Sequence, residues 1–167
     1  QGTVKSADEV IAIDGYKYDS VDKEILTIDT SENVINIYYT KRNDLSYTVN
    51  YLEKDTNIVL HEAKTVGNKT FGDTVNSASE VITINGYNYD SVDKNSITIT
   101  TGSNVINIYY TKKNDLSYTV NYLEKDSNKA IHTPKIIENM IGTVIKSKDE
   151  VITIDGYKYD SADKEGL

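Results

Sequence analysis

Few side chains in this sequence could carry out chemistry, and none belongs to a set that catalysis needs. The 167 residues include no cysteine and only two histidines, His61 and His132. A zinc site takes three or four such ligands, and a nucleophilic serine takes a histidine and a carboxylate beside it. No serine lies in a Gly-x-Ser-x-Gly sequence. We therefore expect two solvated histidines, no catalytic residue, no metal site and no cofactor.

Two other groups of polar residues have simple structural interpretations. Asp90 and Asp93 are close enough in sequence to share a Ca²⁺ ion, but the alternating oxygen ligands and final glutamate of a calcium loop are missing. We expect them in a turn or cap. Lys54, Glu53 and Asn50 match an internal isopeptide crosslink by residue type only, and we prefer ordinary surface polarity as their explanation.

The composition excludes some classes of partner. Lys and Arg number 18 against 26 Asp and Glu, a net charge of −8, which disfavours binding to nucleic acid. No apolar run approaches the roughly 20 residues that span a bilayer, so we expect no membrane insertion. The chain has 14 Tyr beside one Phe and no Trp, which suits half-exposed β-sheets. A chain without cysteine is either cytosolic or exported by an organism that stabilises secreted proteins without disulfides.

The chain repeats itself with a period of about 70 residues, long enough for each copy to be a small domain. The segment 43–55 recurs without change at 114–126, and 34–41 recurs at 105–112. Polar strings separate the copies. The sequence therefore predicts a partial repeat at 1–42, a complete one at 43–113 and a second partial one at 114–167.

The two partial repeats are complementary. The first lacks the Tyr-Thr-Val-Asn-Tyr strand of the complete repeat, and the last lacks its Val-Ile-Asn-Ile-Tyr-Tyr strand. A small sheet without a central strand exposes backbone donors and apolar surface. We therefore expect irregular pairing in these parts, or end-to-end pairing between neighbouring molecules.

Strict alternation predicts strands through most of the complete repeat. Tyr47, Val49 and Tyr51 fall on one face of the first strand. A turn at 54–57 joins it to a second strand at 58–64, in a hairpin.

The later part of the repeat is less regular. Ser77 and Glu80 have the spacing of a capping box, but the β-branched run that follows allows one helical turn at most. Asn85-Gly86 favours a type I′ turn, and propensity alone predicts a hairpin around it. The segments 97–100 and 105–111 are expected to form a last pair of strands.

The repeat also carries the motifs of a known family. It opens with Tyr-Thr-Val-Asn-Tyr-Leu-Glu-Lys-Asp, continues through Gly72-Asp-Thr and Gly86-Tyr-Asn-Tyr, and closes with Val-Ile-Asn-Ile-Tyr-Tyr. In this order the motifs resemble the MucBP (mucin-binding protein) repeat. The resemblance implies a mainly β or α+β fold, with small ubiquitin-like β-grasp modules in an elongated tandem array. It also implies a crossover at 77–85 instead of a strand.

The resemblance further implies an extracellular place, on the cell wall of Gram-positive bacteria, and adhesion to mucin glycoproteins. The candidate binding surface is the outward face of the sheet, where a phenol ring can stack on a sugar while amides bond its hydroxyls. The competing interpretation is that Tyr109 only covers a thin sheet and binds no sugar. The candidate residues are Thr48, Asn50, Asn107 and Tyr109, with Asn36 and Tyr38 as equivalents in the first copy.

The sequence thus predicts a non-enzymatic adhesin fragment that binds mucin-type glycans at several repeats. The first alternative is a structural stalk that projects another binding domain. The second is an accessory module of a wall hydrolase, whose catalytic domain would lie elsewhere.

Overall fold

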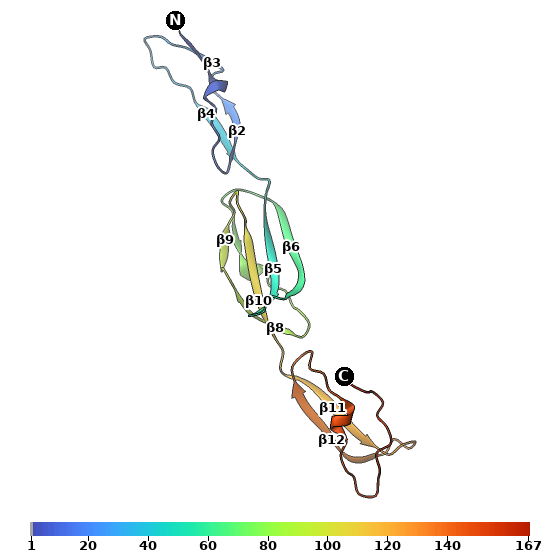
Figure 1. Cartoon of the computed structure of the whole chain (residues 1–167). Coiled ribbons are helices and arrows are strands. Elements are labelled where there is room, and N and C mark those ends of the chain that lie inside the picture. Colours follow the sequence, from blue (N-terminus) through green and yellow to red (C-terminus); the bar gives the residue numbers. More distant parts are fainter. Residues whose placement is uncertain (1) are drawn as a thin grey trace. The chain divides into compact units, whose positions relative to one another are not determined.

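The structure, a computed structural model, describes residues 2–167 and is mainly β (Figure 1). Its helical segments are short 3-10 turns, namely η1 (Ser6–Glu9), η2 (Ser77–Glu80) and η3 (Ser147–Glu150). The strands are β1 (Thr3–Lys5), β2 (Tyr16–Val21), β3 (Ile25–Thr27), β4 (Ile37–Lys41), β5 (Leu45–Glu53), β6 (Val59–Lys69), β7 (Thr74–Asn76), β8 (Tyr87–Val92), β9 (Ser96–Thr98), β10 (Val105–Lys112), β11 (Leu116–Leu123) and β12 (Ala130–Asn139).

Contacts between residues divide the chain into two compact units. The first unit runs up to Ile82 and includes Tyr89–Tyr110, and the second consists of Thr83–Asn88 and Thr111–Leu167. Below, residues 2–42 are called the N-terminal part, 43–113 the middle copy and 114–167 the C-terminal part. This threefold division follows the sequence repeat and stays a prediction.

The middle copy is built on a four-stranded sheet with the strand order β6-β5-β10-β8 (Figure 1). β5 pairs antiparallel with β6 and parallel with β10. A parallel neighbour needs a long connection, and the segment from β6 to β10 supplies it. β7 and β9 form a separate antiparallel pair within that segment.

The core of the middle copy lies on one face of β5 and β10. The inward residues of β5 are Leu45, Tyr47, Val49 and Tyr51, and those of β10 are Ile106, Ile108 and Tyr110. None of them is more than 7% exposed. The alternation read from the sequence and the β5–β6 hairpin are both confirmed.

Propensity alone predicts a hairpin around Asn85-Gly86, which is wrong, whereas the connection without a strand that the MucBP resemblance implies at 77–85 is observed. A turn is present, with Tyr87 N–H donating to Ile84 O at 3.1 Å, but residues 81–84 form no strand. Gly86 has φ +80° while Asn85 is not among the residues with positive φ, which is a type II turn and not type I′. The turn leads into β8, which pairs with β10.

The expected pair of strands at 97–100 and 105–111 is also wrong, because β9 pairs with β7 and β10 lies between β5 and β8. The capping box does not form either. Asn76 caps η2 by accepting from Ala78 N–H at 3.0 Å, while Ser77 Oγ donates to Lys94 O at 2.5 Å. The segment 77–85 is thus a 3-10 turn followed by irregular chain.

The other two parts have smaller sheets. In the N-terminal part, β1 pairs with β3 and β2 with β4. In the C-terminal part, β11 pairs with β12, and Lys146 and Gly166 form an isolated bridge. Within residues 2–167, no strand pairs with the second edge of β4 or of β11. No residue of 114–167 is buried, a mark of low local stability.

The turn at Gly15 is bound to the polar string that precedes β5. Gly15 O accepts from Arg42 N–H at 2.9 Å, and Arg42 O accepts from Phe71 N–H at 2.8 Å. A Cβ at Gly15, whose φ is +78°, would lie 2.5 Å from the Phe71 ring. The second unit repeats these two hydrogen bonds, at 2.9 and 3.1 Å, with Gly86, Lys113 and Ile141.

Candidate functional site

The outward face of β5 and β10 brings the candidate residues of the middle copy together. The parallel register places Asn107 opposite Asn50, and Tyr109 opposite Leu52. Thr48 precedes Asn50 on the same face of β5. The side chains of this face are half-buried. Sequence reasoning therefore identified correctly which residues share this face.

Asn107 is held by hydrogen bonds inside the repeat. Its backbone N–H and its Nδ2 donate to the two carboxylate oxygens of Asp93, at 2.9 and 3.0 Å. Its Oδ1 accepts from Asn50 Nδ2 at 2.9 Å. These bonds orient both amides and use part of the hydrogen-bonding capacity that a sugar would need.

Asn36 and Tyr38 occupy the equivalent places at β4. Asn36 donates from its backbone N–H and its Nδ2 to the two oxygens of Asp22, at 2.8 and 2.9 Å. The backbone bond is the main reason why the pKa of the Asp22 carboxyl lies below its usual range. Tyr38 is 51% exposed and is therefore more accessible than Tyr109, which is half-buried. The aspartate–asparagine pair is thus a repeated support of this face.

The opposite face of β5 contacts a buried carboxylate, that of Glu80 in η2. Tyr47 Oη donates to Glu80 Oε1 at 2.8 Å, Lys64 Nζ donates to Oε2 at 2.6 Å, and Tyr51 Oη donates to Glu80 O at 3.2 Å. Burial alone would raise the pKa of the Glu80 carboxyl, but the hydrogen bonds from Lys64 and Tyr47 outweigh it and lower this pKa. Glu80 therefore ties η2 to the sheet as a charged group. In the C-terminal part Glu150 has the equivalent partners Tyr118, Lys135 and Tyr122.

Both histidines are exposed and lie edge-on to a tyrosine. The ring centroids of His61 and Tyr51 are 5.5 Å apart, and those of His132 and Tyr122 are 5.4 Å apart. Each Nδ1 lies 2.9 Å from the carbonyl oxygen of the next residue. Because each histidine is paired with its tyrosine across the hairpin, the exposed imidazole lies on the same face of the sheet as that tyrosine.

The two aspartates considered for Ca²⁺ contact different partners. Asp90 pairs with Lys54 Nζ at 2.7 Å, and this hydrogen bond is the main cause that lowers the pKa of Asp90. Asp93 binds Asn107 instead. Among residues 2–167, no three His, Asp or Glu side chains are grouped to hold a metal ion.

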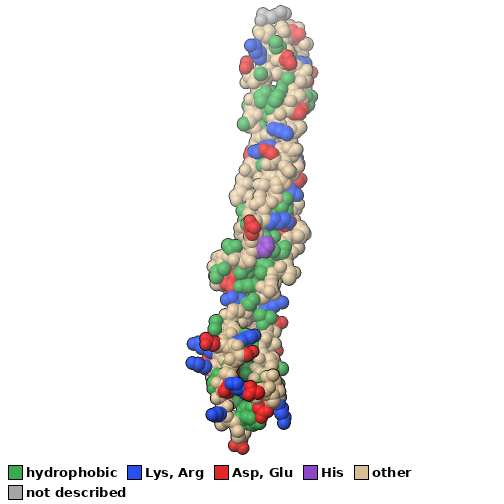
Figure 2. Space-filling view, turned by 90° about the vertical axis from the view of Figure 1, so that its right-hand side faces the viewer, with side chains coloured by type: hydrophobic (Ala, Val, Ile, Leu, Met, Phe, Trp, Pro, Cys, Tyr) green, Lys and Arg blue, Asp and Glu red, His purple; other side chains and the backbone are tan. Residues whose placement is uncertain are grey.

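Charges of both signs are interspersed on the face of the molecule drawn in Figure 2, with hydrophobic side chains between them. A mixed surface of this kind steers charged ligands weakly. In the described part of the chain, no helix has the length and apolar character to cross a membrane.

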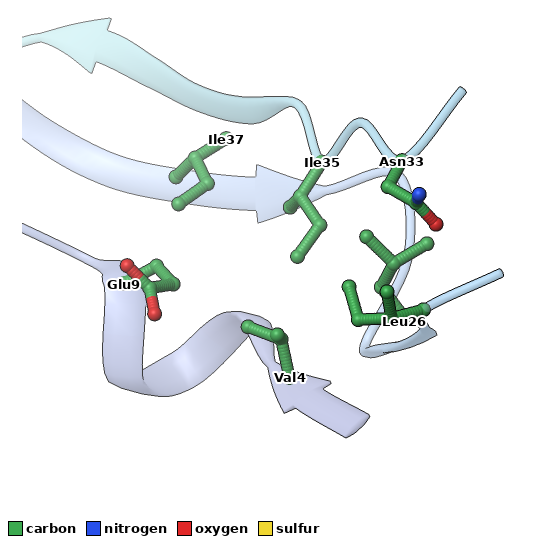
Figure 3. A pocket seen from close by; sticks show the side chains of 7 residues that line it. Val4, Glu9, Leu26, Asn33, Ile35 and Ile37 are labelled. Atoms are coloured by element: carbon green, nitrogen blue, oxygen red, sulfur yellow. The ribbon is translucent and has the colours of Figure 1, made fainter. Parts of the chain in front are cut away.

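Sequence reasoning missed an open hollow of about 330 Å³ in the N-terminal part (Figure 3). It is lined mainly by apolar residues of β1, β3 and the segment that leads into β4. Each lining residue occupies the position of a buried residue of the middle copy. Comparing the copies residue by residue is the signal that could have revealed it.

No family model matches the chain, and neither does any curated protein. The likeness to the MucBP repeat therefore rests on the motifs of the sequence itself.

Proposed function

We propose that this chain is a non-enzymatic segment of a bacterial surface adhesin, located on the cell wall, whose repeats bind mucin-type glycans of host glycoproteins. The observation that carries the proposal is the outward face of β5 and β10, where Tyr109 lies on the same side as Asn50 and Asn107. A ring beside oriented amides suits sugar C–H groups and hydroxyls.

The fold of the middle copy supports the same proposal. An antiparallel hairpin, β5–β6, comes first, an irregular crossover with η2 follows, and the closing strand β10 pairs in parallel beside β5. We infer that this is the β-grasp arrangement that the MucBP resemblance implies, copied in tandem. Repetition raises the effective concentration of weak sites, so modest contacts at each copy add up to useful avidity.

The test is binding to a mucin glycan array by the chain and by the variant Tyr38→Ala/Tyr109→Ala. Loss of two ring–sugar contacts is expected to lower binding about fivefold or more, at about 0.5–1.5 kcal/mol for each aromatic contact. The matched control is Tyr159→Ala, because Tyr159 is 56% exposed and lies outside the candidate faces. Equal binding by all three chains, with the fold intact, would remove these faces as the glycan site.

A structural stalk is the second candidate, and one specific observation favours it. The amides of Asn50 and Asn107 are already bonded to each other and to Asp93, so the face is well suited to stiffen the sheet. If the chain binds no glycan on the array, whatever the number of copies joined in tandem, the result would support the structural stalk.

A further inference from the structure

The hollow of the N-terminal part exposes a surface that is core in the middle copy. Figure 3 shows side chains of Val4, Leu26, Ile35 and Ile37 converging from different segments of the chain, with Glu9 nearby. The equivalent residues of the middle copy are Val75, Ile97, Ile106, Ile108 and Glu80, and each is 9% exposed or less. Figure 2 accordingly shows apolar side chains at the surface of the N-terminal part.

In the middle copy this same surface belongs to the core that β5 completes. Leu45, Tyr47, Val49 and Tyr51 all point into that core, and β5 pairs in parallel with β10. Tyr47 Oη also satisfies the buried Glu80. The piece that fits the hollow is therefore a hairpin with the sequence of β5 and its antiparallel neighbour.

The chain carries a second copy of that hairpin. The segment 114–126 repeats 43–55 without change, and it contains β11. Here Tyr118, Val120 and Tyr122 are only half-buried, and Leu116 is 38% exposed. In the middle copy, β5 has β6 on one edge and β10 on the other. β11 has β12 on one edge, and among residues 2–167 no strand pairs with its other edge.

We propose that the hollow is a docking site for the β11–β12 hairpin of a second copy of this chain. β11 of one molecule pairs in parallel with β4 of the other, and its apolar side chains fill the hollow. The register follows from the middle copy, where Asn107 lies opposite Asn50. In the docked pair, Asn36 lies opposite Asn121. The proposal does not depend on glycan binding.

Docking exchanges one glutamate for another. In its own chain the hairpin holds Glu150, with Tyr118 Oη donating to Oε1 at 2.9 Å and Lys135 Nζ donating to Oε2 at 2.5 Å. Glu9 of the second molecule takes the place of Glu150, so these polar contacts are kept. The gain is a parallel strand ladder and burial of the hollow, which the isolated chain does not have. Exchange of equivalent elements is a low-cost route to association.

Both surfaces are present on every molecule, and they are different surfaces. Association is therefore heterologous, and it extends from one molecule to the next unless two molecules dock reciprocally. Sedimentation velocity should show a mass that rises with protein concentration.

The first test uses two blocked variants. Ile35→Lys/Ile37→Lys places charge in the hollow, and Val120→Lys places charge on the apolar face of β11. Each variant is expected to stay monomeric alone, while an equal mixture forms a 1:1 pair through the two intact surfaces. The control Ile25→Lys, at a residue 59% exposed and outside the hollow, should associate like the unmodified chain. A wild-type chain that stays monomeric at all concentrations overturns the proposal.

The second test reads the register and remains informative if a blocked variant fails to fold. Because the chain has no cysteine, single-cysteine chains report one contact each. Asn36→Cys mixed with Asn121→Cys should give a mixed disulfide at least tenfold faster than Asn36→Cys mixed with Ser117→Cys. Mass spectrometry separates the mixed product from the homodimers. Equal rates for the two mixtures contradict parallel pairing of β4 with β11.

Discussion

Glu80 is a carboxylate placed among apolar side chains, and it is kept charged by two specific donors. Lys64 Nζ and Tyr47 Oη bond its two oxygens, and together they outweigh the cost of burial. Glu80 does not cap η2, but it connects η2 to both strands of the hairpin.

The lowered pKa of Glu80 gives a prediction with a definite sign. Because this pKa is lower in the folded chain than in the unfolded one, Glu80 stabilises the fold above the ordinary glutamate pKa, and this contribution is lost as the pH falls through the folded value. Glu80→Gln is expected to reduce the free energy of unfolding by about 1.5–3 kcal/mol at neutral pH, the range for hydrogen bonds to charged groups.

The difference between the two chains at neutral pH should narrow at an acidic pH below the folded pKa of Glu80, because the wild-type carboxyl then takes up a proton. Urea unfolding at both pH values measures it. Glu62→Gln, at an exposed position of β6, is the matched control and should change stability little. A difference of the same size at both pH values would show that Glu80 acts through its shape and not its charge.

Single residues of the candidate face were predictable only in part. Alternation alone places Asn107 and Tyr109 outward, because side chains along a strand alternate between its faces. The partner of Asn107 was not predicted, since Asp93 lies on a different segment. A signal was nevertheless present, because Asp22 and Asn36 recur at the same separation as Asp93 and Asn107.

At the scale of elements, the hairpin β5–β6 could be predicted because a local turn fixes its register. The parallel pairing of β5 with β10 could not, because sequence alternation says nothing about distant partners. The same limitation explains the wrong pairing expected for β9. Around Asn85-Gly86, local propensity favours a hairpin with the residues before the turn, but β8 pairs with the distant strand β10 instead.

The turns with positive φ give a prediction about close packing. Gly15→Ala introduces a strained backbone angle and a Cβ that meets the Phe71 ring. Gly156→Ala has the same strain, with φ +77°, but no atom within 4 Å. We expect Gly156→Ala to cost about 1 kcal/mol, and Gly15→Ala about 1–3 kcal/mol more.

Chemical denaturation of both variants measures these costs. A double variant, Gly15→Ala/Phe71→Ala, should be less destabilised than the sum of its single variants, because removing the ring removes the clash. If Gly15→Ala costs no more than Gly156→Ala, the contact with Phe71 does not constrain this turn.

At the scale of the whole molecule, repetition has two different consequences. Under the adhesin proposal, the N-terminal part and the middle copy each present a candidate tyrosine, Tyr38 and Tyr109, so binding to a repetitive ligand would gain from copy number. The same sequence identity means that a hairpin of one molecule fits a surface of another, since β5 and β11 carry the same residues. Binding experiments must therefore be made at concentrations where the chain sediments as a monomer.

The most direct test of the adhesin proposal compares one chain with two chains joined in tandem, on a surface of immobilised mucin. If weak faces act together, the apparent affinity of the tandem should exceed that of the single chain by about a hundredfold or more. Tyr38→Ala/Tyr109→Ala in both halves should abolish that gain. A tandem that binds no better than twice the single chain, or does not bind at all, would contradict multivalent contact as the function of these repeats.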